Sequence, residues 1–158
     1  MKMVRDDKTS KIRERSKTLS GLGGDIAKMK FSYEVKNKTE QKYWQRRIER
    51  HTAYFEKSEE YYNQAYQLMR VISSEQADMF LLAVSKFHQL KTKQLKTLEK
   101  IMKNPTVMKS KDRQQSTWSK DAREEIIENS NRCLEHEKIM SMLFREFFDR
   151  YQKDVSGD

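Results

Sequence analysis

Three histidines are the residues of this sequence whose type could bind a metal ion. His51, His88 and His136 fall on the apolar stripes of three separate predicted helices, and imidazoles from facing helices are common metal ligands. If the first two helices fold back on each other near residue 73, His88 lies level with position 59 and near His136. His51 then lies about 12 Å away along the axis, which makes a three-histidine site geometrically poor. A pair of His88 and His136, with Glu135 or Glu137 as an oxygen donor, has no fixed third ligand, and we predict no metal site.

The single cysteine is the only candidate nucleophile with a histidine nearby. Cys133 lies three residues before His136 on one predicted helix face, but its neighbours are acidic, and a reactive thiolate needs an electropositive setting. We therefore predict a buried, inert thiol. The run Gly21-Leu22-Gly23-Gly24 lacks the spacing and the preceding strand of a phosphate-binding loop. The sequence predicts a protein that is not an enzyme and holds no cofactor.

Basic residues are the remaining functional candidates, because lysine and arginine bind polyanions through charge and counterion release. Residues 1–38 hold 11 Lys or Arg against 5 Asp or Glu, whereas residues 118–158 hold 7 against 10. An acidic surface is therefore the predicted partner. The predicted binding residues are Arg5, Lys8, Lys11, Arg13, Arg15 and Lys17 near the N-terminus, and Lys93, Lys96, Lys100 and Lys103 in the second helix.

Two simpler explanations of these charges stay open. The N-terminal residues can merely solvate a disordered tail. The lysines of the second helix can pair within the molecule with Glu124, Glu125 and Glu128 of the third helix, although each exposed pair contributes only about 0–1 kcal/mol.

The spacing of apolar residues predicts the helices that position these side chains. Of the 158 residues 35% are hydrophobic and 36% charged, with 4 Gly and 1 Pro, a composition that favours long helices in one domain. Trp44, His51, Phe55 and Tyr62 belong to a stripe with heptad spacing that runs as far as residue 72. The stripe loses its phase near Ser73, where a new one begins.

This change of phase predicts a tight helical hairpin at residues 71–75, with Ser73 and Gln76 forming a capping box. A continuous helix with a register shift is the alternative. Pro105 ends the second helix, and Ser116 or Thr117 begins the third after an exposed loop. By axial position Trp44 should lie near Met102 and Trp118.

The sequence thus predicts an all-α fold. We expect an antiparallel three-helix bundle, coiled-coil-like, over residues 31–158, with helices at about 33–72, 74–103 and 117–153. Residues 1–30 are predicted to form a flexible or partner-dependent basic arm, because their apolar periodicity is weak and they hold three of the four glycines. A short helix between Thr9 and Leu19 within this arm stays open.

The predicted function is that of a non-enzymatic scaffold or interaction protein that docks into a larger assembly, such as a cytoskeletal or axonemal filament, through its basic arm and bundle surface. The architecture of residues 31–153 also resembles the BAR-type crescent dimers, which implies binding to anionic membranes. A nucleic-acid-binding accessory protein is a third hypothesis, from the pI of about 9.5. Without an apolar signal region or membrane span in the sequence, we expect a cytoplasmic location, and oligomerisation stays open.

Overall fold

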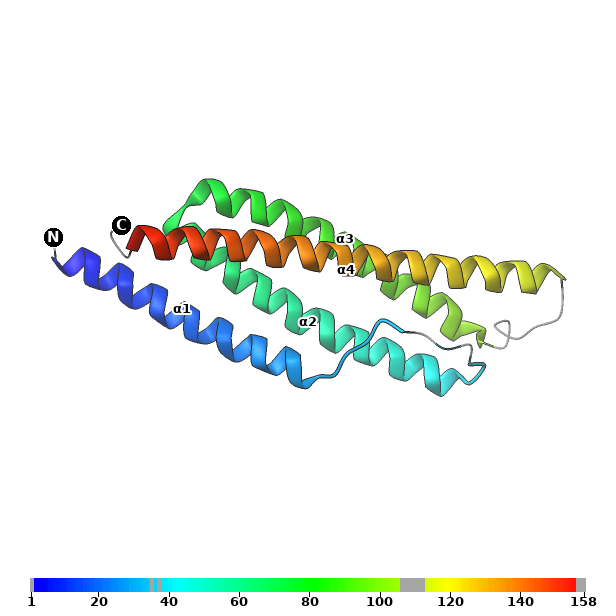
Figure 1. Cartoon of the computed structure of the whole chain (residues 1–158). Helices are drawn as coiled ribbons and strands as arrows, with labels where there is room; N and C mark the ends of the chain where they lie inside the picture. The colour runs from blue at the N-terminus through cyan, green and yellow to red at the C-terminus, as the bar shows by residue number, and fades with distance from the viewer. Residues whose placement is uncertain (1, 35, 37, 106–112, 156–158) are drawn as a thin grey trace.

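The protein is all-helical in the part that the structure describes. This computed structural model describes the backbone of residues 2–34, 36, 38–105 and 113–155, and the side chains of residues 10–34, 36, 38–105 and 123–150. Four helices and no strands occur in these ranges: α1 (Lys2–Lys28), α2 (Gln41–Ile72), α3 (Ser74–Lys103) and α4 (Arg113–Val155). They run alternately in opposite directions along one long axis (Figure 1). The all-α prediction is confirmed, whereas the prediction of three helices is corrected to four.

The additional helix, α1, occupies the segment that the sequence predicts as a flexible basic arm. It packs on α2 with Ile12, Leu19 and Leu22 buried. Each glycine in a helix costs about 1 kcal/mol relative to alanine, and for this reason the sequence favours a flexible arm over a helix here. Packing against α2 stabilises α1 although its own helix propensity is low. The two helices are close at Gly23, where an added Cβ would lie 3.6 Å from the ring of Tyr61.

The helical hairpin is confirmed, because Ser73 alone separates α2 from α3. Its backbone is extended (φ −150°, ψ 105°), its N–H donates to the Met69 carbonyl at 2.7 Å, and its carbonyl accepts from Ala77 at 3.1 Å. The predicted capping box is wrong, since the Ser73 side chain makes no capping hydrogen bond. Backbone bonds alone close this turn. At its other end α3 stops at Lys103, just before Pro105, as predicted.

The segment between α1 and α2 corrects the predicted start of the first bundle helix from about residue 33 to Gln41. Lys30 adopts a left-handed backbone conformation (φ 52°), which ends the helical path. The following residues, which we call the 31–34 linker, lie along α2. The ring of Phe31 stacks on that of Tyr54 with centroids 3.9 Å apart. The apolar side chains of the linker are therefore buried through aromatic contact with α2, and not as part of a helix.

Helix α4 begins at Arg113, four residues before the predicted start, so that part of the predicted loop is helical. The remainder of that loop, residues 106–112, lies outside the described residues. So do the side chains of Ser116, Thr117 and Trp118, which the sequence placed at the helix start and at the bundle end.

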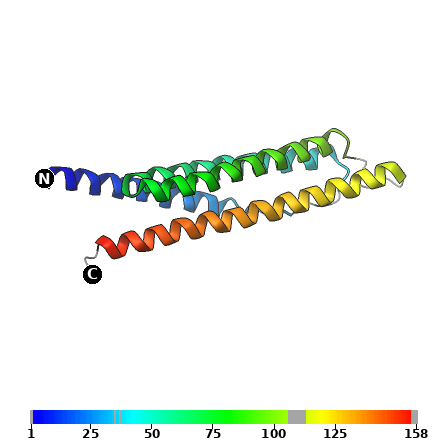
Figure 2. The same ribbon diagram turned by 90° about the horizontal axis from the view of Figure 1, so that it is seen from above.

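The helices pack in the order α1, α2, α3, α4, with a smaller contact between α2 and α4. In the described part of the chain, α1 and α4 are not among the pairs that pack closely, and the two views show them apart (Figure 2). A closed four-helix bundle would bury the faces of α1 and α4 against each other. Here that fourth interface is open.

The core consists of two hydrophobic clusters. The larger contains Phe55, Phe80, Phe87, Met140 and other residues toward the hairpin, and the smaller contains Trp44, Leu98, Ile101 and Ile126 toward the opposite end. Met102 packs on the smaller cluster with Trp44, as the axial alignment predicts.

Candidate functional site

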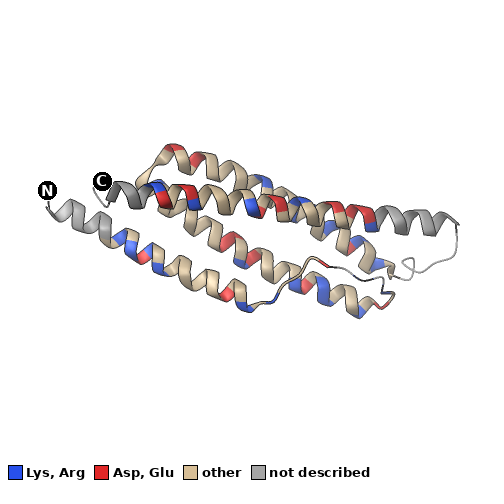
Figure 3. Cartoon of the chain, viewed as in Figure 1, with Lys and Arg blue, Asp and Glu red and all other residues tan. Residues whose placement is uncertain are grey.

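The predicted basic residues of α1 lie on the surface of a helix that has one close neighbour. Lys11, Arg13 and Lys17 are exposed, and Arg15 is half-buried. The side chains of Arg5 and Lys8, which were also predicted to bind, are not among those that the structure describes. Among the described residues, Arg13, Arg15 and Lys17 make no ion pair or hydrogen bond through their side chains. In Figure 3 the ribbon of this helix is coloured blue at its described lysines and arginines.

The predicted lysines of α3, Lys93, Lys96, Lys100 and Lys103, are also exposed. The predicted alternative of pairing with α4 does not account for three of them, since Lys93, Lys96 and Lys103 form no ion pair with a described residue.

The α4 carboxylates have other partners. Glu125 accepts a hydrogen bond from Thr97 at 3.1 Å, and Glu128 pairs with Arg132 at 2.6 Å. The structure does not gather the two basic groups into one patch: residues 11–17 and 93–103 lie toward opposite ends of the molecule (Figure 1).

The three histidines have different surroundings. His88 lies level with position 59, as predicted, and its Nδ1 is 2.7 Å from Glu59 Oε1, which Lys91 also contacts at 2.5 Å. The Nδ1 of His136 is buried without a partner. In the ranges whose side chains are described, no group of three or more His, Cys, Asp or Glu could hold a metal ion.

Cys133 is buried at the centre of the larger cluster. Burial raises the pKa of its thiol to about 12, and the nearby carboxylate of Glu137 acts in the same direction. The thiol is therefore protonated at neutral pH, and thiolate chemistry at this position is unfavourable.

A buried polar layer separates the two hydrophobic clusters. On α2 the boundary falls at Arg47 and His51, on α3 at Gln94, and on α4 at Asn129 and Ser130. Gln94 Nε2 donates to Ser130 Oγ at 2.9 Å, but Gln94 Oε1, His51 Nε2 and Asn129 Nδ2 form no hydrogen bond with any residue that the structure describes. Unpaired buried polar groups typically cost about 1–3 kcal/mol each, so this layer is retained at the expense of stability.

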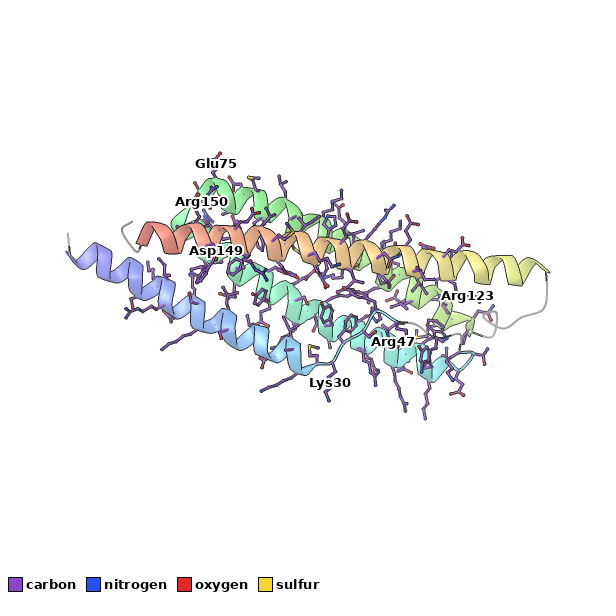
Figure 4. The ribbon with its side chains drawn as sticks, in the orientation of Figure 1. Lys30, Arg47, Glu75, Arg123, Asp149 and Arg150 are labelled. Carbon is purple, nitrogen blue, oxygen red and sulfur yellow. The ribbon has the colours of Figure 1, made fainter. Side chains whose placement is uncertain are left out.

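Two side chains of the layer form hydrogen bonds to backbone carbonyls. These bonds hold the linker in place and orient the imidazole ring of His51. Arg47 donates through Nη2 to the carbonyls of Ser32 (2.7 Å) and Glu34 (2.5 Å), and so holds the linker on α2 (Figure 4). His51 lies 2.8 Å from the Arg47 carbonyl through Nδ1, which must be the protonated nitrogen because a carbonyl only accepts. Burial, with a smaller effect of the Arg47 charge, lowers the pKa of His51 to about 4 against the opposing effect of the hydrogen bond to the Arg47 carbonyl.

A carboxylate held by two tyrosines is the feature that sequence reasoning missed. Oε1 of Glu137 on α4 accepts hydrogen bonds from Tyr54 (2.6 Å) and from Tyr33 (2.9 Å) of the linker. Burial raises the pKa of Glu137, and the two hydroxyl hydrogen bonds act against this rise. No lysine, arginine or histidine of the described residues is among the groups that shift this pKa.

These residues line a cavity between the 31–34 linker, α2 and α4. Its volume is about 790 Å³, and Arg123, which precedes Glu137 by 14 residues on α4, also lines it. The cavity walls include Phe31, Tyr33, Tyr54, Ile127 and Leu134. A second, smaller cavity continues along α4, where it is lined by Tyr61, Phe144 and Phe148. The only sequence signal for the site was the apolar stripe through His51 and Phe55, beside which Tyr54 lies, since the sequence gives no signal for the position of the linker.

Comparisons of the chain with family models, with curated proteins and with solved structures find no match. Among the described residues, no helix has both the length and the apolar composition needed to cross a membrane. The function must therefore be argued from the surfaces and the cavity themselves.

Proposed function

We propose that this protein is a non-enzymatic helical interaction protein that docks into a larger assembly, such as a cytoskeletal or axonemal filament, through its basic surfaces. The partner is an acidic protein surface. The observation that carries this proposal is a set of basic side chains, on two helices, that have no ion pair among the described residues. They are Arg13, Arg15, Lys17, Lys93, Lys96 and Lys103.

The placement of α1 supports docking through this helix. It has one closely packed neighbour, so most of its circumference is available to a partner. Its buried residues, Ile12, Leu19 and Leu22, occupy one stripe. Arg13 and Lys17 lie outside this stripe, whereas Arg15 falls within it and is half-buried. A basic helix on a bundle gives a long, directional surface, on which charge complementarity raises association rates and selects acidic partners.

Exposed apolar side chains near the hairpin give a second contact element. Met79 is 58% and Leu82 is 74% exposed on α3, and both precede the lysine-rich half of the same helix. Apolar residues surrounded by charge are typical of protein interfaces, where they supply the desolvated centre of a polar rim. This combination favours a protein partner over a purely electrostatic contact with nucleic acid.

The test is chemical crosslinking and capture from native lysate with the full chain and two charge-reversal variants. The first variant combines Arg13→Glu with Lys17→Glu on α1. The second combines Arg46→Glu with Arg50→Glu, which are exposed on α2, and changes the net charge by the same amount. We expect a dominant acidic protein partner that the wild type and the α2 variant retain and the α1 variant loses.

Equal loss with both variants, or no loss with either, would contradict docking through α1. Two further assays address the alternatives. Co-sedimentation with anionic vesicles that Lys93→Glu and Lys96→Glu abolish would favour the BAR-like membrane function instead. A gel shift whose affinity falls steeply with salt would favour nucleic acid.

A further inference from the structure

We infer that the cavity between the 31–34 linker, α2 and α4 binds a small organic ammonium ion with an apolar body, whose charged end pairs with Glu137. This site is separate from the basic surfaces of the proposed function and has the opposite charge. The inference stands on three observations: a carboxylate without a cation, aromatic walls beside it, and a cavity of ligand size.

The first observation concerns the electrostatic environment of Glu137. Both tyrosine hydroxyls bind Oε1, while Oε2 accepts no hydrogen bond from a described residue and is not fully buried. A carboxylate removed from water is normally paired with a cation, because neutral hydrogen bonds replace only part of its hydration. An ammonium ion in the cavity would supply the missing counterion at Oε2.

The second observation is the aromatic character of the adjacent walls. Phe31 and Tyr54 are stacked, and the ring of Tyr33 stands at 85° to both. Tyr33 and Tyr54 are held in place by their hydrogen bonds to Glu137, so rings and carboxylate form one rigid corner. Aromatic rings attract organic cations through their electron-rich faces, and a carboxylate beside them adds full charge complementarity.

The third observation is the size and polarity of the cavity. Its volume of about 790 Å³ lies in the range of small-molecule sites, about 300–1,000 Å³. It extends along α4 from Glu137 to Arg123, which is about 21 Å by helical rise. Ile127 and Leu134 line the intervening stretch, so a ligand whose ammonium group meets Glu137 would lay its apolar body against these side chains.

The charge distribution selects the sign of the ligand. An anion placed at this end of the cavity would meet the Glu137 carboxylate and, at the rim, Glu34. A neutral ligand would fill the apolar volume but leave the carboxylate without a counterion. A matched series of probes with one apolar body and different head groups can separate these cases.

Isothermal titration calorimetry with phenylbutylamine, phenylbutanol and phenylbutyrate tests the inference on the full chain at neutral pH. We expect phenylbutylamine to bind the wild type at least about tenfold more tightly than phenylbutanol, and phenylbutyrate to bind weakest. Glu137→Gln keeps an acceptor for the tyrosines but removes the charge. This variant should lose the preference for the amine, while its affinity for the alcohol stays about the same.

Glu135→Gln is the matched control, because Glu135 is an exposed carboxylate of the same helix and is not among the residues that line the cavity. It should change the affinity for the amine less than about twofold, since exposed charges are screened. Equal binding of amine and alcohol by the wild type, no binding of the amine, or unchanged amine affinity in Glu137→Gln would each overturn the inference. If Glu137→Gln does not fold, the comparison of the three probes on the wild type decides.

Discussion

The buried histidine of the polar layer should make the stability of this protein fall in mild acid. His51 has no exposed surface, and burial lowers its pKa to about 4, whereas an unfolded histidine has a pKa of about 6.5. The unfolded chain therefore binds a proton at His51 more readily than the native state does. Lowering the pH from 7 to 5 should reduce the free energy of unfolding by about 2 kcal/mol through this residue alone.

That change is large beside the 5–15 kcal/mol stability of a typical domain. With a urea m-value of about 2 kcal/mol/M, it would lower the midpoint of unfolding by about 1 M. Urea titrations followed by circular dichroism, at pH 7 and pH 5, would measure it. Carboxylates titrate over the same range, so the His51→Leu variant is the reference, because Leu fits the apolar neighbours Phe31 and Phe55 and has no proton to bind.

The wild type should lose about 2 kcal/mol more than His51→Leu between these pH values. Equal losses in the wild type and His51→Leu would refute the reasoning. So would a histidine pKa near 6.5 for His51 in an NMR titration of the wild type, a measurement that does not depend on the variant folding.

Three further predictions concern α1, its C-terminal end and the tyrosine-bound carboxylate. Gly21→Ala and Gly24→Ala should each stabilise α1 by up to about 1 kcal/mol, because an added Cβ meets no atom within 4 Å at either position. Hydrogen exchange of the α1 amides measures this effect: protection should increase in each variant, and unchanged protection would speak against the helix. Lys30→Gly should raise the free energy of unfolding by about 0.5–1 kcal/mol by relieving the left-handed backbone, and a lower thermal midpoint would count against that geometry. Burial raises the pKa of Glu137 in the native state, so its contribution to stability is full below the unfolded pKa and is lost as the pH rises through the native pKa. Relative to the wild type, Glu137→Gln should therefore gain stability in urea titrations from pH 4 to pH 7, and a constant difference would be inconsistent with the raised pKa.

The sequence was sufficient for the parts of the fold that regular spacing determines. The stripe containing Trp44, His51 and Phe55 is buried on α2, and the hairpin at Ser73 places His88 beside Glu59. Heptad spacing and helical rise are local, cumulative properties, so they fix which residues face inward and which positions lie level along the axis.

Local rules failed where tertiary contact decides the structure. Helix α1 has three glycines and few apolar residues, and its packing on α2 could not be inferred from its own sequence. The path of the linker is also non-local: Phe31 and Tyr33 reach α2 and α4 only because Lys30 redirects the chain. Because the sequence does not reveal that path, it indicates only that Glu137 is a surface carboxylate of an acidic helix.

The polar layer has a consequence for how the helices choose their alignment. Heptad stripes are nearly self-similar, so sliding α4 along α3 by seven residues would keep most apolar contacts. That slide would, however, move Ser130 from the level of Gln94 to the level of Phe87 or Ile101, where no amide could bind its hydroxyl. Each polar group stranded among apolar side chains would add about 1–3 kcal/mol to the shifted arrangement. The layer thus penalises every shifted pairing more than the native one, and gives a repetitive sequence a single lowest-energy alignment.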